Sequence, residues 1–75
     1  MNHQHSMQHL TALLPKAVEL LAHHEAGTRN AVAQAISEFG GDAAPYVPNL
    51  HEALVRESNV MTRQSLEGAV KSITP

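Results

Sequence analysis

The sequence contains no cysteine. It therefore cannot form a disulfide, a thiolate zinc site or a thiol nucleophile. Only packing within the chain, or packing against a partner, is left to hold a fold of this size. The absence of cysteine slightly favours a reducing compartment but does not identify which compartment contains the protein.

Long apolar runs are also lacking. No stretch approaches the roughly 18 apolar residues that a helix needs to span a membrane. Met1 to Gln8 is polar and rich in histidine, whereas a signal peptide starts with a basic segment and continues with an apolar one. We therefore expect a soluble, cytoplasmic protein with no membrane partner.

Neither sign of charge is in excess, and the chain is short. Five Lys and Arg residues stand against seven Asp and Glu residues in 75 residues, for a net charge of −2. This balance lacks the basic stripe of a nucleic-acid binder. A chain of this length forms one small domain and buries only roughly 60% of its unfolded surface, which leaves little material for a deep substrate cavity. We do not expect an elaborate enzyme.

Aromatic residues are scarce and alanine is abundant. Phe39 and Tyr46 are the only aromatic residues, whereas the chain has 11 alanines. Alanine is the strongest helix former, and strands prefer β-branched and aromatic residues. The composition therefore favours closely packed helices.

Apolar residues recur at spacings of three and four in the first half of the chain, which is the pattern of amphipathic helices. One predicted helix runs from about Thr11, its expected N-cap, to His23. A second runs from Thr28, again as the cap, to Phe39, and Gly40-Gly41 stops it. The residues expected to face inward are Leu10, Leu13, Leu14, Ala17 and Leu21, then Ala31, Val32, Ala35, Ile36 and Phe39.

The second half of the chain repeats this helical pattern. Asp42 is the expected cap of a third helix, and Pro45 and Pro48 fall in or near its first turn. A fourth helix covers about Met61 to Ile73. The inward residues are Val47, Leu50, Ala53 and Leu54, then Leu66, Ala69, Val70 and Ile73. No segment alternates with a period of two, so we predict an all-α domain of four helices.

The two halves also align with each other. Leu14-Pro15 and Leu21 superpose on Val47-Pro48 and Leu54 at an offset of 33. At an offset of 34, the residues Arg29, Ala35, Ile36 and Phe39 superpose on Arg63, Ala69, Val70 and Ile73. This period predicts two stacked antiparallel hairpins, 10–40 and 42–74, in one domain of residues 10–75. A flexible, polar leader would cover 1–9. An unrelated four-helix bundle with coincident spacing is the alternative.

The repeated residues resemble a known family. The run from Ala43 to Leu50, followed by Ala53-Leu54, Arg63, Leu66, Ala69, Val70 and Ile73, looks like a HEAT-like repeat, the helical hairpin of the armadillo and HEAT superfamily. The first unit follows the pattern more loosely, so the resemblance covers residues 10 to 74. It implies a superhelical stack of hairpins. It says little about biochemistry, because such repeats serve scaffolds, transport factors, bilin lyases and DNA-repair glycosylases.

The turn within each unit departs from the usual HEAT pattern. The family usually has an aspartate about four residues before the arginine, but here Glu25 precedes Arg29 and only Asn59 precedes Arg63. The residue before the arginine, usually valine, is Thr28 in one unit and Thr62 in the other. We therefore expect a weakened ladder of acid–arginine pairs between the units, and no long, regular solenoid.

Six histidines are the obvious candidates for metal chemistry, because imidazole is both a metal ligand and a base near neutral pH. His5 and His9 are four residues apart, so on a helix they would share a face and could hold zinc, nickel or copper. Met1-Asn2-His3, with a free amino terminus, could separately hold copper or nickel. The alternative is a frayed polar leader. His23-His24 is expected to stabilise the end of the first helix through the helix dipole, and His51 to face solvent.

Catalytic patterns are missing from the sequence. The carboxylates are scattered over predicted polar faces and turns, and Glu57 is one of those assigned to the solvated surface. No G-x-S-x-G nucleophile elbow occurs, and Gly40-Gly41 lacks the lysine of a phosphate loop. We therefore predict no catalytic residue and no cofactor.

The remaining candidates are surfaces. In the HEAT family the second helix of each unit lines the concave side, which here would present Arg29, Asn30, Gln34, Ser37, Arg63, Gln64, Glu67 and Lys71. Apolar residues are also expected at the ends of the stack: Leu10, Leu13, Val18 and Leu20 at one end, and Val55, Val60 and Met61 near the other loop edge. Because stable arrays usually need about three units, we expect self-association or packing against a partner.

We therefore expect a non-catalytic protein-interaction module or adaptor, with a protein or peptide partner. Nucleic-acid binding is not expected, because the few cations would have to converge on one surface. Two alternatives stay open. One is a HEAT-like lyase or DNA-repair type of protein, and the other is a small metal-binding protein that uses His3, His5 and His9.

Overall fold

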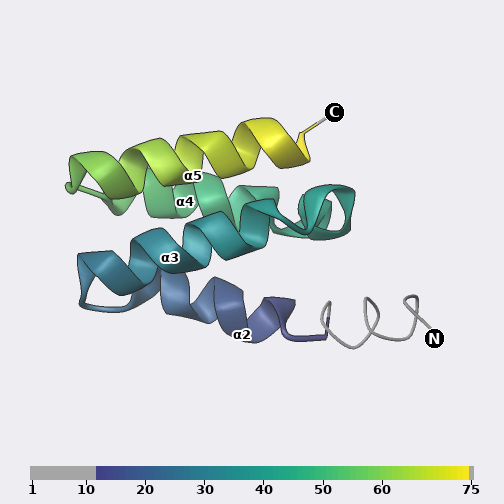
Figure 1. Ribbon diagram of the computed structural model, residues 1–75, viewed down its shortest axis with the longest axis horizontal. Helices are drawn as coiled ribbons and strands as arrows, with labels where there is room; N and C mark the ends of the chain where they lie inside the picture. Colours follow the sequence, from purple (N-terminus) through teal and green to yellow (C-terminus); the bar gives the residue numbers. More distant parts are fainter. Residues whose placement is uncertain (1–11, 75) are drawn as a thin grey trace.

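The computed structural model describes residues 12–74, and in this range the chain forms four α-helices, two 3₁₀ segments and no strand (Figure 1). The predicted all-α class is confirmed. The leader 1–9, with its three histidines, and the residues Leu10 and Thr11 lie outside the described range. The elements are α2 (Leu14–Glu19), η1 (Leu20–Ala22), α3 (Ala26–Ser37), η2 (Gly40–Tyr46), α4 (Val47–Arg56) and α5 (Val60–Ile73).

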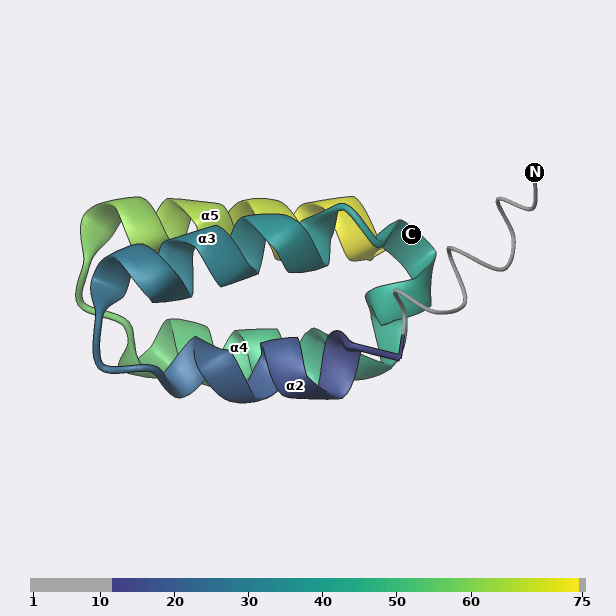
Figure 2. The same ribbon diagram turned by 60° about the horizontal axis from the view of Figure 1, so that its bottom comes forward.

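The helices form two antiparallel hairpins that lie side by side. We call α2, η1 and α3 unit 1, and α4 and α5 unit 2. Figure 2 shows α3 next to α5 in one layer and α2 next to α4 in the other, with η2 joining the units. The most extensive packing between any two elements is that of α3 against α5. The second helices therefore make most of the contact between the units.

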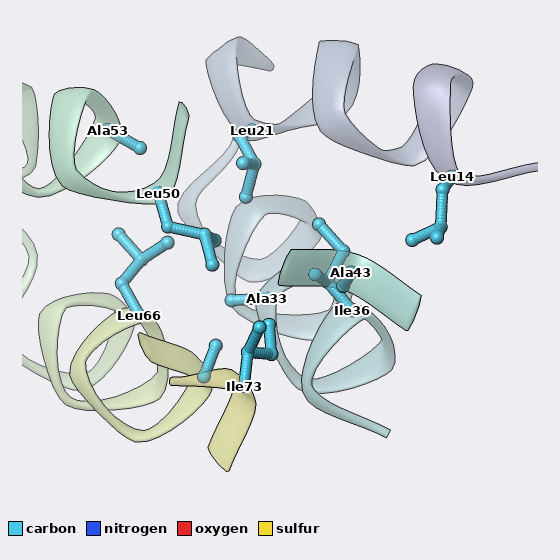
Figure 3. Packing of buried hydrophobic residues seen from close by; sticks show 10 residues of the cluster. Leu14, Leu21, Ala33, Ile36, Ala43, Leu50, Ala53, Leu66 and Ile73 are labelled. Atoms are coloured by element: carbon cyan, nitrogen blue, oxygen red, sulfur yellow. The ribbon is translucent and has the colours of Figure 1, made fainter. Parts of the chain in front are cut away.

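The core lies between the two layers. Its buried members come from all four α-helices and both 3₁₀ segments, and they are Leu14, Leu21, Ala33, Ile36, Ala43, Leu50, Ala53, Leu66, Ala69 and Ile73. Figure 3 shows the side chains of Leu21, Leu50 and Leu66 gathered between the helices, where Ala33 contributes only a methyl group. Alanines at such positions let neighbouring helices approach closely, which agrees with the abundance of alanine in the chain.

Two predicted helix starts are wrong. The helix α3 begins at Ala26 and its N-cap is Glu25, not Thr28. Asp42 lies within η2 and does not cap α4, which starts at Val47. In α5 the cap is Asn59, whose side chain accepts a hydrogen bond of 3.0 Å from the backbone N–H of Thr62. The first helix is also shorter than predicted, because α2 gives way to the tighter η1 at Leu20.

The inward face predicted for α3 is confirmed at Ile36, which is buried, and Val32 and Phe39 pack against the core. Ala31 and Ala35 are exposed, however, and Ala33 is buried in their place. The most extensive packing of α3 is against α5, and a buried alanine allows two helices to approach closely. The inward faces predicted for the second half are confirmed at Leu50, Ala53, Leu66, Ala69 and Ile73.

The glycine stop after α3 is confirmed. Gly40 has a φ of +57°, the left-handed conformation that glycine adopts without the cost of a Cβ atom. The chain can therefore reverse direction there and enter η2, which carries it to the start of unit 2.

Candidate interaction site

Each unit has one turn between its helices, and the two turns lie at the same edge of the molecule (Figures 1 and 2). In unit 1 the turn is 23–25, and in unit 2 it is 57–59. His23 and Glu57 end their helical segments with extended backbones, at ψ 146° and ψ 124°. Glu25 and Asn59 start the next helices with ψ 125° in both cases. The backbone of one turn thus repeats in the other at an offset of 34.

The side chains repeat the same contacts. Nδ1 of His23 accepts a hydrogen bond of 3.1 Å from the N–H of Glu25, and Oε2 of Glu57 accepts one of 3.0 Å from the N–H of Asn59. Nη1 of Arg29 donates to the carbonyl of His23 at 2.7 Å, and Nη1 of Arg63 donates to the carbonyl of Glu57 at 3.1 Å. Each arginine is therefore fixed to the turn of its own unit, six residues before it.

The two units are joined by an ion pair between Arg29 and Glu57. The Nε atom of Arg29 donates to Oε1 at 2.7 Å and its Nη2 atom donates to Oε2 at 2.9 Å. The carboxylate is almost fully buried, with 4% of its side chain exposed, and the guanidinium is 19% exposed. This two-point contact matches the planar fork of arginine to the two oxygens of a carboxylate.

The pair changes the titration of both groups. The hydrogen bonds from Arg29 lower the pKa of Glu57, against the opposing effect of burial. The hydrogen bond to Glu57 raises the pKa of Arg29. Both side chains are therefore charged near neutral pH, and the pair is held as an ion pair.

This pair corrects two expectations drawn from the sequence. Glu57 is not a solvated surface residue, and an acid–arginine pair between the units does form. The acid comes from the end of α4 in unit 2, six residues before Arg63, and not from the position closer to the arginine. The sequence gives no clear signal for this pair, because Glu57 aligns with His23, and not with another acid, at an offset of 34.

Thr62 adds a second link between the units. It is buried, and its Oγ1 lies 3.3 Å from the carbonyl of Ala26 and 3.1 Å from Oδ1 of Asn59. The single hydroxyl proton can bond one of these acceptors at a time. Ser65 on α5 also donates to Oδ1 of Asn30 on α3. The hydroxyl of Thr62 is thus part of the contact between α3 and α5.

A cleft of about 260 Å³ opens between the two turns. Its polar lining comes from His23, His24, Arg29, Arg56, Glu57 and Ser58. The carboxylate of Glu57 is occupied by Arg29, so it is not free to act as a general base. The cleft therefore offers a recess with polar walls and with no free carboxylate among its lining residues.

Three potential metal ligands lie at one side of this cleft. The ligand atoms of His23, His24 and Glu25 lie within 4.8 Å of one another. However, the two rings are stacked, with centroids 4.4 Å apart and planes at 23°, and Nδ1 of His23 is used by the N–H of Glu25. The lone pairs of nearly parallel rings do not point at one ion, so the cluster is not arranged as a coordination site. His51 is exposed, as expected.

The residues of the predicted interaction surface fall into two groups, those with contacts inside the fold and those that are exposed. Arg29 and Asn30 are engaged within the fold by Glu57 and Ser65. Arg63 is half-buried, and its Nη1 also donates to the carbonyl of Leu54 at 2.7 Å. The residues left exposed are Gln34, Gln64, Glu67 and Lys71.

The apolar residues expected at the loop edge are exposed. Val55, Val60 and Met61 have 86%, 67% and 68% of their surfaces accessible. At the other end of the stack Leu13 is 56% exposed, whereas Val18 and Leu20 are half-buried. We call Val55, Val60 and Met61, which flank the turn of unit 2, the apolar margin.

Comparison of the chain with family models, with curated proteins and with solved structures gave no match. Between residues 12 and 74, the structure has no helix that combines the length and the apolar character needed to cross a membrane.

Proposed function

We propose that this protein is a non-catalytic protein-interaction module, built from two HEAT-like hairpins and acting in the cytoplasm. The observation that carries the proposal is the apolar margin of Val55, Val60 and Met61, which lies exposed around one turn. Grouped apolar side chains on a surface are a common mark of a protein interface. Arg63 adjoins this margin in sequence and supplies a positive charge of the kind that interfaces favour.

The HEAT-like assignment is supported by the two matching turns. Three features recur at an offset of 34. They are the backbone angles of the turn, the hydrogen bond that the first turn side chain accepts from the N–H two residues later, and the hydrogen bond from the arginine to the carbonyl six residues before it. The Arg29–Glu57 pair supplies the acid–arginine contact that the resemblance implies between neighbouring units.

The pairing of charged side chains within the fold favours a protein-binding role over catalysis or nucleic-acid binding. Within residues 12–74, three of the cationic side chains are paired with carboxylates: Lys16 with Glu19, Arg29 with Glu57 and Arg56 with Glu52. Ion pairs of this kind leave little positive charge to neutralise phosphates. They also occupy Glu57, the buried acid that lines the cleft.

The proposal can be tested by capturing partners on the full-length chain in the cells that produce it. Two variants, Val60→Asp and Met61→Asp, place a charge on the apolar margin without touching the core. Ala44→Asp is the control, because it adds the same charge at an exposed position of η2, away from the turns. A partner that the wild type and the control retain, but that both margin variants lose at least tenfold, supports the proposal. A set of captured proteins that is the same for all four chains contradicts it.

A further inference from the structure

Unit 1 packs one of its sides against unit 2, and the equivalent side of unit 2 has no unit packed against it among the residues that the structure describes. In unit 1, Leu14, Leu21 and Ile36 are buried, and unit 2 stacks next to them. Their counterparts in unit 2, at offsets of 33 and 34, are Val47, Leu54 and Val70, which are only half-buried. The side of unit 2 that faces away from unit 1 therefore keeps part of its apolar surface accessible. We call Val47, Leu54, Val70 and Arg63 the outer face.

Arg63 has the same anchor as Arg29 but lacks the same partner. Both arginines use Nη1 to bind the carbonyl of their own turn. The Nε and Nη2 atoms of Arg29 then bind the carboxylate of Glu57 from the next unit. Among residues 12–74, no carboxylate pairs with Arg63. Its guanidinium is thus held in place by two carbonyls with its remaining donors available.

We propose that the outer face binds a helical segment of another protein, and that Arg63 receives a carboxylate from the end of that segment. The binding would copy the way in which the end of α4 presents Glu57 to Arg29. This inference rests on the proposed function, since it names the kind of partner that the interaction module takes.

The charge pattern defines the partner further. Glu67 on α5 aligns with Ala33 on α3, which is fully buried beneath unit 2. A segment that covers the outer face in the same way must place a cationic or polar group opposite Glu67, because an unpaired carboxylate is costly to bury. The expected partner helix therefore carries an acid for Arg63 and a base for Glu67.

A second copy of this chain does not fit that description. If copies stacked as the two units do, His23 of one copy would take the place of Glu57 and meet Arg63 of the other. An imidazole cannot give the two-point contact of a carboxylate, and its Nδ1 atom already accepts from Glu25. The chain thus lacks the acid that would let copies stack end to end.

The first test gives the chain the acid that a partner of Arg63 needs, so that a second copy can bind the outer face. The probe is the full-length chain with His23→Glu and Glu67→Ala, which supplies the acid and removes the uncompensated charge. Its self-association constant, measured by sedimentation equilibrium, should exceed that of Glu67→Ala alone at least tenfold. Adding Arg63→Gln should remove the gain, whereas adding Arg56→Gln should keep it. Circular dichroism verifies that each chain is folded, and His23→Asp is a second acid variant if His23→Glu is not.

The outcome is decisive in both directions. A gain that depends on Arg63 supports the outer face, whereas equal association with and without the acid overturns the proposal. In the partner capture described above, Arg63→Gln should also lose the partner while Arg56→Gln retains it. If capture depends on Val60 and Met61 but not on Arg63, the interaction module stands and the outer face is wrong. If no capture depends on any of the three, the proposed function itself fails.

Discussion

Replacing Glu57 with glutamine should destabilise the whole domain. The carboxylate accepts two hydrogen bonds from Arg29, at 2.7 and 2.9 Å, and one of 3.0 Å from the N–H of Asn59. Glutamine keeps one carbonyl oxygen but adds an NH₂ donor, which would face either the guanidinium or the N–H, and both of these are donors. At least one of the three bonds is therefore lost, and the half-buried arginine loses its counter-charge.

The expected cost can be set between two limits. Breaking a fully buried ion pair is strongly destabilising, whereas breaking an exposed one has little effect. Glu57 is nearly buried, but the adjoining cleft allows water to reach the site. We expect Glu57→Gln to lower the free energy of unfolding by about 1–3 kcal/mol, the range for leaving a buried hydrogen-bonding group without its partner. For a domain of this size, that is a fall in Tm of about 5–20 °C.

Glu52→Gln is the matched control. It removes the same charge from the same unit and breaks an ion pair with Arg56, but that pair is 3.4 Å long and both side chains are exposed. It should change the free energy of unfolding by less than about 0.5 kcal/mol. Thermal denaturation followed by circular dichroism at neutral pH measures both variants. Equal shifts in Tm for the two would show that the Arg29–Glu57 pair does not stabilise the fold, and the reasoning would be refuted.

Three further predictions concern pH, a glycine and a buried hydroxyl. The pKa of Glu57 in the folded chain lies below its ordinary value of 4.5, so as pH falls the carboxylate is protonated first in the unfolded chain. The stabilisation from this group is therefore present above pH 4.5 and is lost as pH falls through the lowered pKa. Urea titrations should show that acid lowers the free energy of unfolding less in Glu57→Gln than in wild type. Gly40→Ala should cost about 1 kcal/mol in the same titrations because φ is +57°, whereas Gly41→Ala should be close to neutral; neither added Cβ meets another atom within 4 Å. Thr62→Val should cost about 1 kcal/mol, because the hydroxyl bond to Ala26 or Asn59 is lost while the side-chain volume is kept. A gain in Tm would show that the buried hydroxyl does not stabilise this site.

The periodic apolar pattern predicted the inward side of α4 and α5, but only part of that of α3, where Ile36 is buried as expected. In α4 and α5 large residues such as Leu50 and Leu66 mark the buried side clearly. In α3 the residues Ala31, Ala33 and Ala35 are chemically the same, so the pattern cannot say which of them is buried. That choice is made by the packing of α5, a neighbour more than 20 residues away along the chain.

The helix starts show a second limit of local reasoning. Thr28 and Asp42 have side chains that commonly cap helices, yet α3 begins at Ala26 and Asp42 lies in η2. In unit 1 the turn is set by other contacts, namely the bond from Arg29 to the carbonyl of His23 and the bond from the N–H of Glu25 to His23. These contacts place the helix start two residues before Thr28, whatever the local preference of the threonine.

Glu57 shows a third limit, because its role depends on a residue 28 positions earlier in the chain. Sequence alone shows an acid at the end of an amphipathic helix, and most such acids are solvated. The alignment of the two halves gives no help, since the matching residue in unit 1 is His23. Only the folded arrangement, in which unit 2 brings its own turn next to the arginine of unit 1, identifies the pair.

The side-chain bonds between the units explain how so short a chain holds together without a disulfide. The ion pair of Arg29 and Glu57, the hydroxyl of Thr62 and the bond from Ser65 to Asn30 all connect unit 1 with unit 2. The core is also shared, since its buried residues come from both units and the most extensive packing is that of α3 against α5. Neither hairpin can complete this core or form the Arg29–Glu57 pair alone, so we expect the two units to form together. The outer face of unit 2 is equivalent to the side of unit 1 that unit 2 covers. It is therefore the site that we propose for one further helix.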